Sequence, residues 1–204
     1  MIARLEVFRH HVQLTSSIAV GAATRTVFTI GHSTRTIEEF AGLLGASAID
    51  LVVDVRSIPR SRTNPQFNRD AMPDALAPYR IGYEHIAGLG GRRSKVRSAE
   101  PSLNGFWRVT AFHNYADYAL TPPFAEGFAR LRQLDEQRTC AIMCSEAVWW
   151  RCHRRIITDY LLAAGEKVIH ILGAGHVDEA TLTPGAVTRE DGSVIYPAAS
   201  TDQS

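Results

Sequence analysis

The segment from Cys144 to Arg154 carries the residues best suited to chemistry. It reads Cys-Ser-Glu-Ala-Val-Trp-Trp-Arg-Cys-His-Arg and directly follows the apolar run 139–143. That run is typical of a short buried strand, and the pattern after the segment is typical of a helix. Ligands of α/β proteins bind where strands run out into such loops. We therefore expect thiol, carboxylate, imidazole and guanidinium groups to meet here in one site.

Within this segment Glu146 is the leading candidate for an acid or a base. Its alternative role is structural, as a helix-capping carboxylate or one paired with an arginine. In a helix expected at about 151–164, Cys152 and His153 head two apolar rows of i, i+4 spacing, so both should point inward toward Glu146. Cys152 would then lie in the first turn of the helix, where the positive end of the helix dipole would lower the pKa of its thiol. Cys152 could equally be a small core residue.

Three further polar clusters lie at or near the ends of other predicted strands: Gly31-His32-Ser33, Asp54-Val55-Arg56 and His170. Because the carboxyl ends of parallel strands share one edge of a sheet, we expect these clusters to meet the Cys144 segment. Asp54 and Arg56 are two residues apart and therefore share one side of an extended chain. Thr36 and Glu39, three residues apart, predict a capping box that opens the next helix. His32 precedes this helix, where backbone N–H groups can receive an anion.

The alternation of strands and helices predicts a single α/β domain. Its mostly parallel sheet should have about five strands, with helices on both faces. The expected strands are 26–30, 50–55, 82–86, 140–144 and 167–172. Asp191-Gly192 between two short apolar pairs predicts a C-terminal hairpin. The domain should span 26–198, with a loosely attached N-terminal extension at 1–25 and a tail at 199–204.

Length and composition exclude several classes of protein. A chain of 204 residues with 45% hydrophobic content can bury one sizeable core. Its three cysteines are too few for a disulfide scaffold, and it lacks the Cys-x-x-Cys pairs of common zinc sites. No run approaches the length of a membrane span. We expect a cytoplasmic protein with no membrane partner, and the oligomeric state stays open.

The net charge of +1 conceals a basic segment. Between Val55 and Ala99, nine basic residues stand against three acidic ones, which gives this segment a net charge of +6. Arginine accounts for 20 of the 22 basic residues, and its planar fork suits phosphate and carboxylate oxygens. The favoured partner is therefore a phosphate-bearing small molecule or a nucleic acid. Codon composition or ordinary surface charge would explain the same pattern without a ligand.

Two familiar chemistries fit the spacing poorly. A phosphatase-type thiolate loop needs a closer cysteine–arginine pair than Cys144 and Arg151, and Cys152 has no arginine at the required distance. A zinc site needs three or four ligands, yet neighbouring side chains such as Cys152 and His153 diverge by about 100° on a helix. We therefore expect no metal and no obligatory cofactor.

Spaced motifs occur over about residues 27–172: Thr29-Ile-Gly-His-Ser33, Leu51-Val-Val-Asp-Val-Arg56 with Pro59 and Ser61, Tyr83 with Leu89-Gly90-Gly91, and Met143-Cys-Ser-Glu146 through Cys152-His153-Arg154 to His170. In these motifs the chain resembles the family called domain of unknown function 488. The resemblance implies a compact intracellular α/β domain and supplies no agreed reaction. One departure is Ala147-Val148-Trp149-Trp150, where we expect such families to carry a polar, proline-containing link. The tryptophans could shape the pocket wall, stack on a planar ligand or pack under the loop.

The leading functional hypothesis is an enzyme that hydrolyses a nucleotide or a nucleic-acid component, with an N-glycosidic bond as one target. The candidate catalytic residues are Glu146, Asp54, His153, His32 and Cys144. The candidate substrate-binding residues are Arg56, Ser33, Gly31, Tyr83, Arg92, Arg93, Trp149, Cys152, Arg154 and His170. One alternative is a thiol enzyme centred on Cys144 or Cys152 with His153 as base. The other is a regulatory module that binds a phosphorylated ligand without catalysis.

Overall fold

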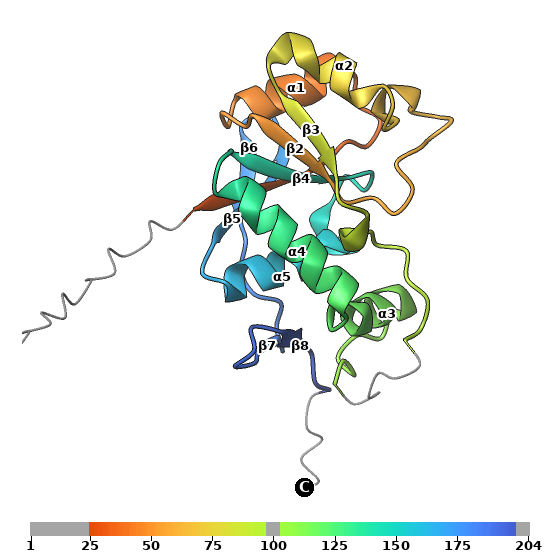
Figure 1. Cartoon of the computed structure of the whole chain (residues 1–204), viewed down its shortest axis with the longest axis vertical. Helices are drawn as coiled ribbons and strands as arrows, with labels where there is room; N and C mark the ends of the chain where they lie inside the picture. The colour runs from red at the N-terminus through yellow and green to blue at the C-terminus, as the bar shows by residue number, and fades with distance from the viewer. Residues whose placement is uncertain (1–24, 97–102, 199–204) are drawn as a thin grey trace, which may run out of the picture.

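A six-stranded sheet organises the computed structural model, which describes residues 25–96 and 103–198 (Figure 1). The strand order is β3-β2-β4-β1-β5-β6. The strands are β1 (Thr26–Gly31), β2 (Leu51–Asp54), β3 (Gly82–His85), β4 (Cys140–Cys144), β5 (Lys167–Gly173) and β6 (His176–Glu179). All neighbours pair in parallel except β5 and β6, so the prediction of a mostly parallel α/β sheet is confirmed. The expected extension and tail lie outside the described residues, apart from Arg25.

Helices cover both faces of this sheet (Figure 1). One face carries α1 (Ile37–Gly45) and α2 (Met72–Leu76), and the other carries α3 (Thr110–Ala119), α4 (Pro122–Asp135) and α5 (Arg154–Ala163). Single turns of 3-10 helix occur in the connections: η1 (Pro65–Phe67), η2 (Ala77–Tyr79), η3 (Ala87–Leu89) and η4 (Trp149–Arg151). No helix within the described ranges is long and apolar enough to cross a membrane.

The alternation of side chains along the strands divides the core into two parts. Val52 and Ile30 pack with Phe40 of α1 and Met72 of α2 on one face. On the other face, residues such as Ile142 pack with α3, α4 and α5. Both faces of the central strands are buried, which explains why their sequences are continuous apolar runs.

Two local predictions about helix and hairpin signals are confirmed. Thr36 and Glu39 form the expected capping box: the Thr36 hydroxyl accepts from the backbone N–H of Glu39 at 3.2 Å, and the Glu39 carboxylate accepts from that of Thr36 at 2.9 Å. The C-terminal hairpin pairs β7 (Val187–Thr188) with β8 (Val194–Ile195). Sequence analysis missed β6, whose residues are all exposed and mostly polar, so that no apolar run marks it.

The helix after β4 begins later than expected. Helix α5 starts at Arg154, and His153 is its N-cap residue. Cys152 has an extended backbone with φ −121° and ψ 146°, because its N–H closes the η4 turn on the carbonyl of Trp149 and the chain then changes direction. The expectation that Cys152 lies in the first turn of the helix is therefore wrong.

Strands β1 and β4 form the point where the chain diverges. After β1 the chain passes through α1 to β2 on one side of this pair, and after β4 it passes through α5 to β5 on the other side. Such a switch in direction leaves a crevice at the carboxyl ends of the two strands. The loops that follow stay paired there, since the N–H of His32 donates to the carbonyl of Cys144 at 2.9 Å and that of Ser33 to Ser145 at 3.0 Å.

Gly31 allows this close approach, and its replacement tests the arrangement. A Cβ atom at Gly31 would overlap the carbonyl oxygen of Glu146, whereas one at Gly42 in α1 would meet open space. We expect Gly31→Ala to lower the free energy of unfolding by about 1–3 kcal/mol, as overpacking does. Gly42→Ala should instead raise it by roughly 0.5–1 kcal/mol, because alanine favours a helix. Urea denaturation measures both, and equal effects would contradict the close approach.

Candidate functional site

A cavity of about 640 Å³ opens at the carboxyl edge of the sheet. Its walls come from the loops after β1, β2 and β4, from the turn at Gly91 and Arg92, and from the start of α3. The volume lies within the range typical of small-molecule sites. The predicted site residues that line it are Glu146, His153, His32, Cys144, Arg56, Ser33, Arg92 and Cys152. The predicted residues that do not line it are Asp54, Gly31, Tyr83, Arg93, Trp149, Arg154 and His170.

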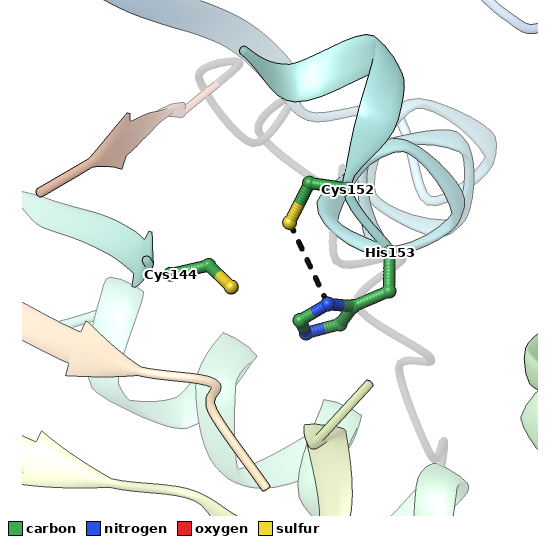
Figure 2. Close-up of side chains that lie close together, drawn as sticks. All are labelled: Cys144, Cys152 and His153. Atoms are coloured by element: carbon green, nitrogen blue, oxygen red, sulfur yellow. Dashed lines mark hydrogen bonds between the residues drawn. The ribbon is translucent and has the colours of Figure 1, made fainter. Parts of the chain in front are cut away.

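Cys144, Cys152 and His153 converge on one wall of this cavity (Figure 2). The Cys152 Sγ lies 3.5 Å from Nδ1 of His153, and the nearest ligand atoms of all three residues lie within 4.8 Å of one another. The two thiols are only 6% and 2% exposed as residues. The Nε2 of His153 lies 2.8 Å from the carbonyl oxygen of Val55, which can only accept. Nε2 therefore carries a proton, and in the neutral tautomer that this bond selects the lone pair is on Nδ1.

The expected divergence of Cys152 and His153 is wrong. It assumed that both residues belong to a helix, whereas Cys152 precedes the helix with an extended backbone. The two side chains consequently converge, and they face Cys144 (Figure 2). Two sulfurs and one imidazole nitrogen in this arrangement are a possible donor set for a metal ion.

The two thiols of this cluster have opposite acidities. Burial by itself would raise the pKa of Cys152, but the Cys144 thiol and the Arg154 guanidinium, whose Nε lies 3.4 Å from Sγ, lower it to about 6. The hydrogen bond with Cys152 and burial together raise the pKa of Cys144 to about 12. At neutral pH, one negative charge therefore resides on Cys152 and is stabilised by a neutral thiol and a buried cation.

Behind the cavity, Arg154 joins three parts of the chain. Its guanidinium is buried and donates to Cys152, to the hydroxyl of Thr29 at 3.4 Å and to the carbonyl of Glu146 at 2.6 Å. The hydroxyl of Thr29 in turn lies 2.8 Å from Nδ1 of His170. Arg154 thus supports the cavity wall and does not face the cavity.

His170 and Trp149 belong to the same supporting layer. His170 lies within β5, which β1 separates from β4. Its ring stacks on that of Trp149, with the two centroids 4.3 Å apart. Burial and the charge of Arg154 lower the pKa of His170 to about 3, so the imidazole is neutral. Of the roles considered for Trp149, the structure shows packing under the loop.

Asp54 and Arg56 form a buried ion pair beside the cavity. The Nε of Arg56 lies 2.9 and 3.1 Å from the two carboxylate oxygens of Asp54, and the hydroxyl of Tyr83 donates to one of them at 2.7 Å. Asp54 is fully buried, and only Arg56 of this group lines the cavity. The carboxylate of Asp54 and the phenol of Tyr83 therefore orient the guanidinium of Arg56.

His32 is likewise held in place by Arg56. Its Nδ1 donates to the carbonyl of Ser33 at 2.8 Å, which leaves Nε2 to accept from Nη1 of Arg56 at 3.1 Å. The ring stacks on Phe67 with centroids 4.2 Å apart. Burial, together with the charge of Arg56, lowers the pKa of His32 to about 4. Both ring nitrogens are engaged, so His32 positions Arg56 and the loop after β1.

Exposed side chains of both signs line the rest of the cavity. Arg60, Arg92, Arg151 and Glu146 are exposed, and the carboxylate of Glu146 forms no ion pair among the described residues. The alternative structural role, in which this carboxylate pairs with Arg151, Arg154 or Arg56, is thus not seen among the described residues. Arg93 turns away, because it donates to the carbonyls of Gly90 and Ala87 and packs over the ring of Tyr118.

Sequence reasoning missed several residues of the cavity wall. Arg60 belongs to the basic segment and Arg151 to the central motif, so both had a signal that we did not use. Ala111 and Phe112 reach the cavity from α3, and their sequence carries no such signal. Only the three-dimensional placement of α3 identifies them.

The family model of the domain of unknown function DUF488 matches residues 36–161. The chain belongs to this family. The matched range includes Cys144, Cys152 and His153 as well as the pair of Asp54 and Arg56. His32 and His170 lie outside it. Neither a comparison with curated proteins nor one with solved structures gave a match.

Two variants test whether the Glu146 carboxylate is exposed and unpaired and whether the Asp54 carboxylate is buried and paired. Glu146→Gln removes an exposed charge without an ion pair, so we expect the free energy of unfolding to change by less than about 0.5 kcal/mol. Asp54→Asn leaves the buried Arg56 without its counter-charge and should cost roughly 3–5 kcal/mol. Urea denaturation followed by circular dichroism measures both. A large loss in Glu146→Gln would instead assign Glu146 to the scaffold.

Alkylation tests the lowered pKa of Cys152. In a buffer that contains a metal chelator, iodoacetamide should modify Cys152 faster than Cys140, because burial raises the pKa of Cys140 to about 12. The rate at Cys152 should rise as the pH passes through about 6 and then level off, because the thiolate predominates above its pKa. Mass spectrometry of peptides gives the rate at each cysteine. Equal rates at neutral pH would argue against the assignment.

Proposed function

We propose that this DUF488 protein is a hydrolase that acts on a phosphate-bearing small molecule of about nucleotide size. One observation carries the proposal: a single cavity at the switch point of the sheet gathers arginines, a carboxylate and the cluster of Cys144, Cys152 and His153. Its volume of about 640 Å³ suits a nucleotide better than a long nucleic-acid strand. A nucleic acid, which carries the same phosphate groups, is the alternative substrate.

The arginines supply recognition of an anion. Arg60, Arg92 and Arg151 are exposed, so their guanidinium groups can turn toward a phosphate, whereas Arg56 is fixed in the wall by Asp54. Arginine binds phosphate through two parallel hydrogen bonds. Since the charge of Glu146 would repel a phosphate, we place the reacting bond near Glu146 and the phosphate beside the arginines.

Glu146 is proposed as the general base. Hydrolysis consumes one water molecule, whose oxygen bonds to the electrophilic carbon while the leaving group departs with the electron pair of the broken bond. Glu146 accepts a proton from the water and returns it to the leaving group, which balances the reaction. An N-glycosidic bond suits this site, because the carboxylate also stabilises the cation that develops on the sugar.

A second candidate function is a cysteine-dependent enzyme. It is favoured by the distance of 3.5 Å between the Cys152 Sγ and Nδ1 of His153, the nitrogen that keeps its lone pair. In that reaction the Cys152 thiolate would bond to the electrophilic centre of the substrate, and the leaving group would depart with the electron pair of the broken bond. His153 would then act as the base that accepts a proton from the water that releases the product from the sulfur. A binding module would use the same arginines without turnover.

Arg151→Ala tests the anion site, with Arg130→Ala as its control. Arg130 pairs with Glu84 on the outer surface of α4 and does not line the cavity. We expect Arg151→Ala to weaken the binding of nucleoside phosphates about tenfold, and the affinity of the parent protein to fall as salt rises. Arg56→Ala is unsuitable, because it would leave the buried Asp54 carboxylate without its counter-charge.

Calorimetric titrations with nucleotides, inorganic phosphate and a single-stranded oligonucleotide measure these affinities, and chromatography of the released base measures turnover. Glu146→Gln should retain the affinity and lower the rate by about 10²–10⁴-fold. Binding without turnover would leave a regulatory module, and preference for the oligonucleotide would make nucleic acid the substrate. Equal affinities in the two arginine variants would overturn the anion site.

A further inference from the structure

We infer that Cys144, Cys152 and His153 bind one zinc ion, with a fourth coordination position open to the cavity. The site stands on its own geometry, whereas its catalytic use rests on the proposed function. All three side chains line the cavity, so an ion held by them would be accessible to a water molecule or a substrate. Three protein ligands and one open position are the usual form of a catalytic zinc site.

The spacing of the three ligand atoms suits zinc. Tetrahedral coordination with ordinary zinc bond lengths places a sulfur about 3.5 Å from a nitrogen and about 3.8 Å from a second sulfur. The Cys152 Sγ and His153 Nδ1 are 3.5 Å apart, and the three atoms all lie within 4.8 Å of one another. Small side-chain adjustments would complete the site, as Figure 2 shows all three groups facing one point.

His153 is already prepared as a ligand. Its Nε2–H donates to the carbonyl of Val55 at 2.8 Å, which directs the lone pair of Nδ1 toward the two sulfurs. Metal-bound histidines commonly use their other nitrogen in this way, and the bond fixes both tautomer and orientation. Gly91 lies so close to the ring that a Cβ there would overlap Nδ1, and the edge of Tyr115 contacts the ring with centroids 5.0 Å apart.

The surroundings of the sulfurs also suit a metal–thiolate bond. The Nε of Arg154 donates to the Cys152 Sγ at 3.4 Å, and N–H groups of this kind stabilise the charge of a coordinated thiolate. Two thiolates neutralise the two charges of the zinc ion, so the complex adds no net charge to this buried wall. Sulfur ligands also disfavour magnesium and calcium, which prefer oxygen.

Zinc binding would also decide between the two proposed reactions. A thiolate bound to zinc serves as a ligand, which leaves water as the nucleophile of the hydrolase. Zinc lowers the pKa of a bound water to about 7. Glu146 lines the same cavity and is not needed as a ligand, so it can accept the proton of that water.

Metal content and cobalt substitution of the full chain test the site. We expect purified protein to contain about one zinc ion per chain, and the chelator-treated protein with Co(II) to show thiolate-to-cobalt absorption in the near ultraviolet. Competition with a chromophoric chelator gives the zinc affinity. Cys144→Ser and Cys152→Ser should each weaken that affinity at least about 100-fold and reduce the thiolate absorption.

Cys140→Ser is the matched control, because Cys140 is a buried cysteine on the same strand and points to the same face as Cys144. It should retain the affinity and the absorption of the parent. Gly91→Ala keeps all three ligands but pushes on the His153 ring, and it should weaken zinc binding by about 10–100-fold. Circular dichroism checks that every variant is folded, and Glu146→Gln should bind zinc as the parent does.

A zinc affinity that is unchanged in Cys152→Ser, or the absence of thiolate-to-cobalt absorption in the folded parent, would overturn the site. Stoichiometric zinc without nucleotide binding or turnover would support the site and reject the proposed function. Turnover that survives chelation but is abolished by Cys152→Ser would reject the zinc site and identify a cysteine enzyme.

Discussion

The buried guanidinium of Arg154 is the contact on which the candidate site depends. It links the hydroxyl of Thr29 in β1, the carbonyl of Glu146 after β4 and the sulfur of Cys152 before α5. A buried cation is tolerated only where acceptors surround it, and here those acceptors are the groups that must be positioned. The same charge favours the thiolate of Cys152 and disfavours protonation of His170. The guanidinium of Arg154 therefore both positions the side chains at this edge of the sheet and sets their protonation states.

A second buried arginine completes the frame. Arg56 is held by Asp54, which also accepts from Tyr83, and its guanidinium reaches His32 and the carbonyl of Phe67. Arg56 is thus a fixed cation in the cavity wall and Arg154 a fixed cation behind it, whereas the remaining arginines of the cavity are exposed. Such a division suits a ligand site, because the rigid groups define its shape and the exposed ones can adapt to a ligand.

The sequence predicted the architecture better than the roles of individual side chains. Apolar runs revealed β1, β2, β4 and β5, and the half-buried β3 was also predicted, whereas the exposed β6 carries no such pattern. The polar clusters were correctly placed at strand ends except for His170, which lies within β5. A sequence cannot reveal that Cys152 precedes its helix, nor that Asp54 faces Arg56 and Tyr83 while Glu146 stays exposed, because these depend on tertiary contacts and on where a turn closes. The convergence of Cys144, Cys152 and His153, on which the proposed zinc site rests, depends on the same tertiary contacts.

The central position of β1 and β4 has a further consequence for how the site arises. These strands are neighbours in space but far apart in the chain, and the whole segment that forms α1 to α4 lies between them. Pairing of such distant segments must overcome the entropy of closing a long loop, so it is expected to be slow during folding. A partial chain that ends before β4 could pair only β2 with β3, because both neighbours of β1 come later in the chain, and it would contain neither thiol of the cluster. Assembly of the site is therefore tied to completion of the domain.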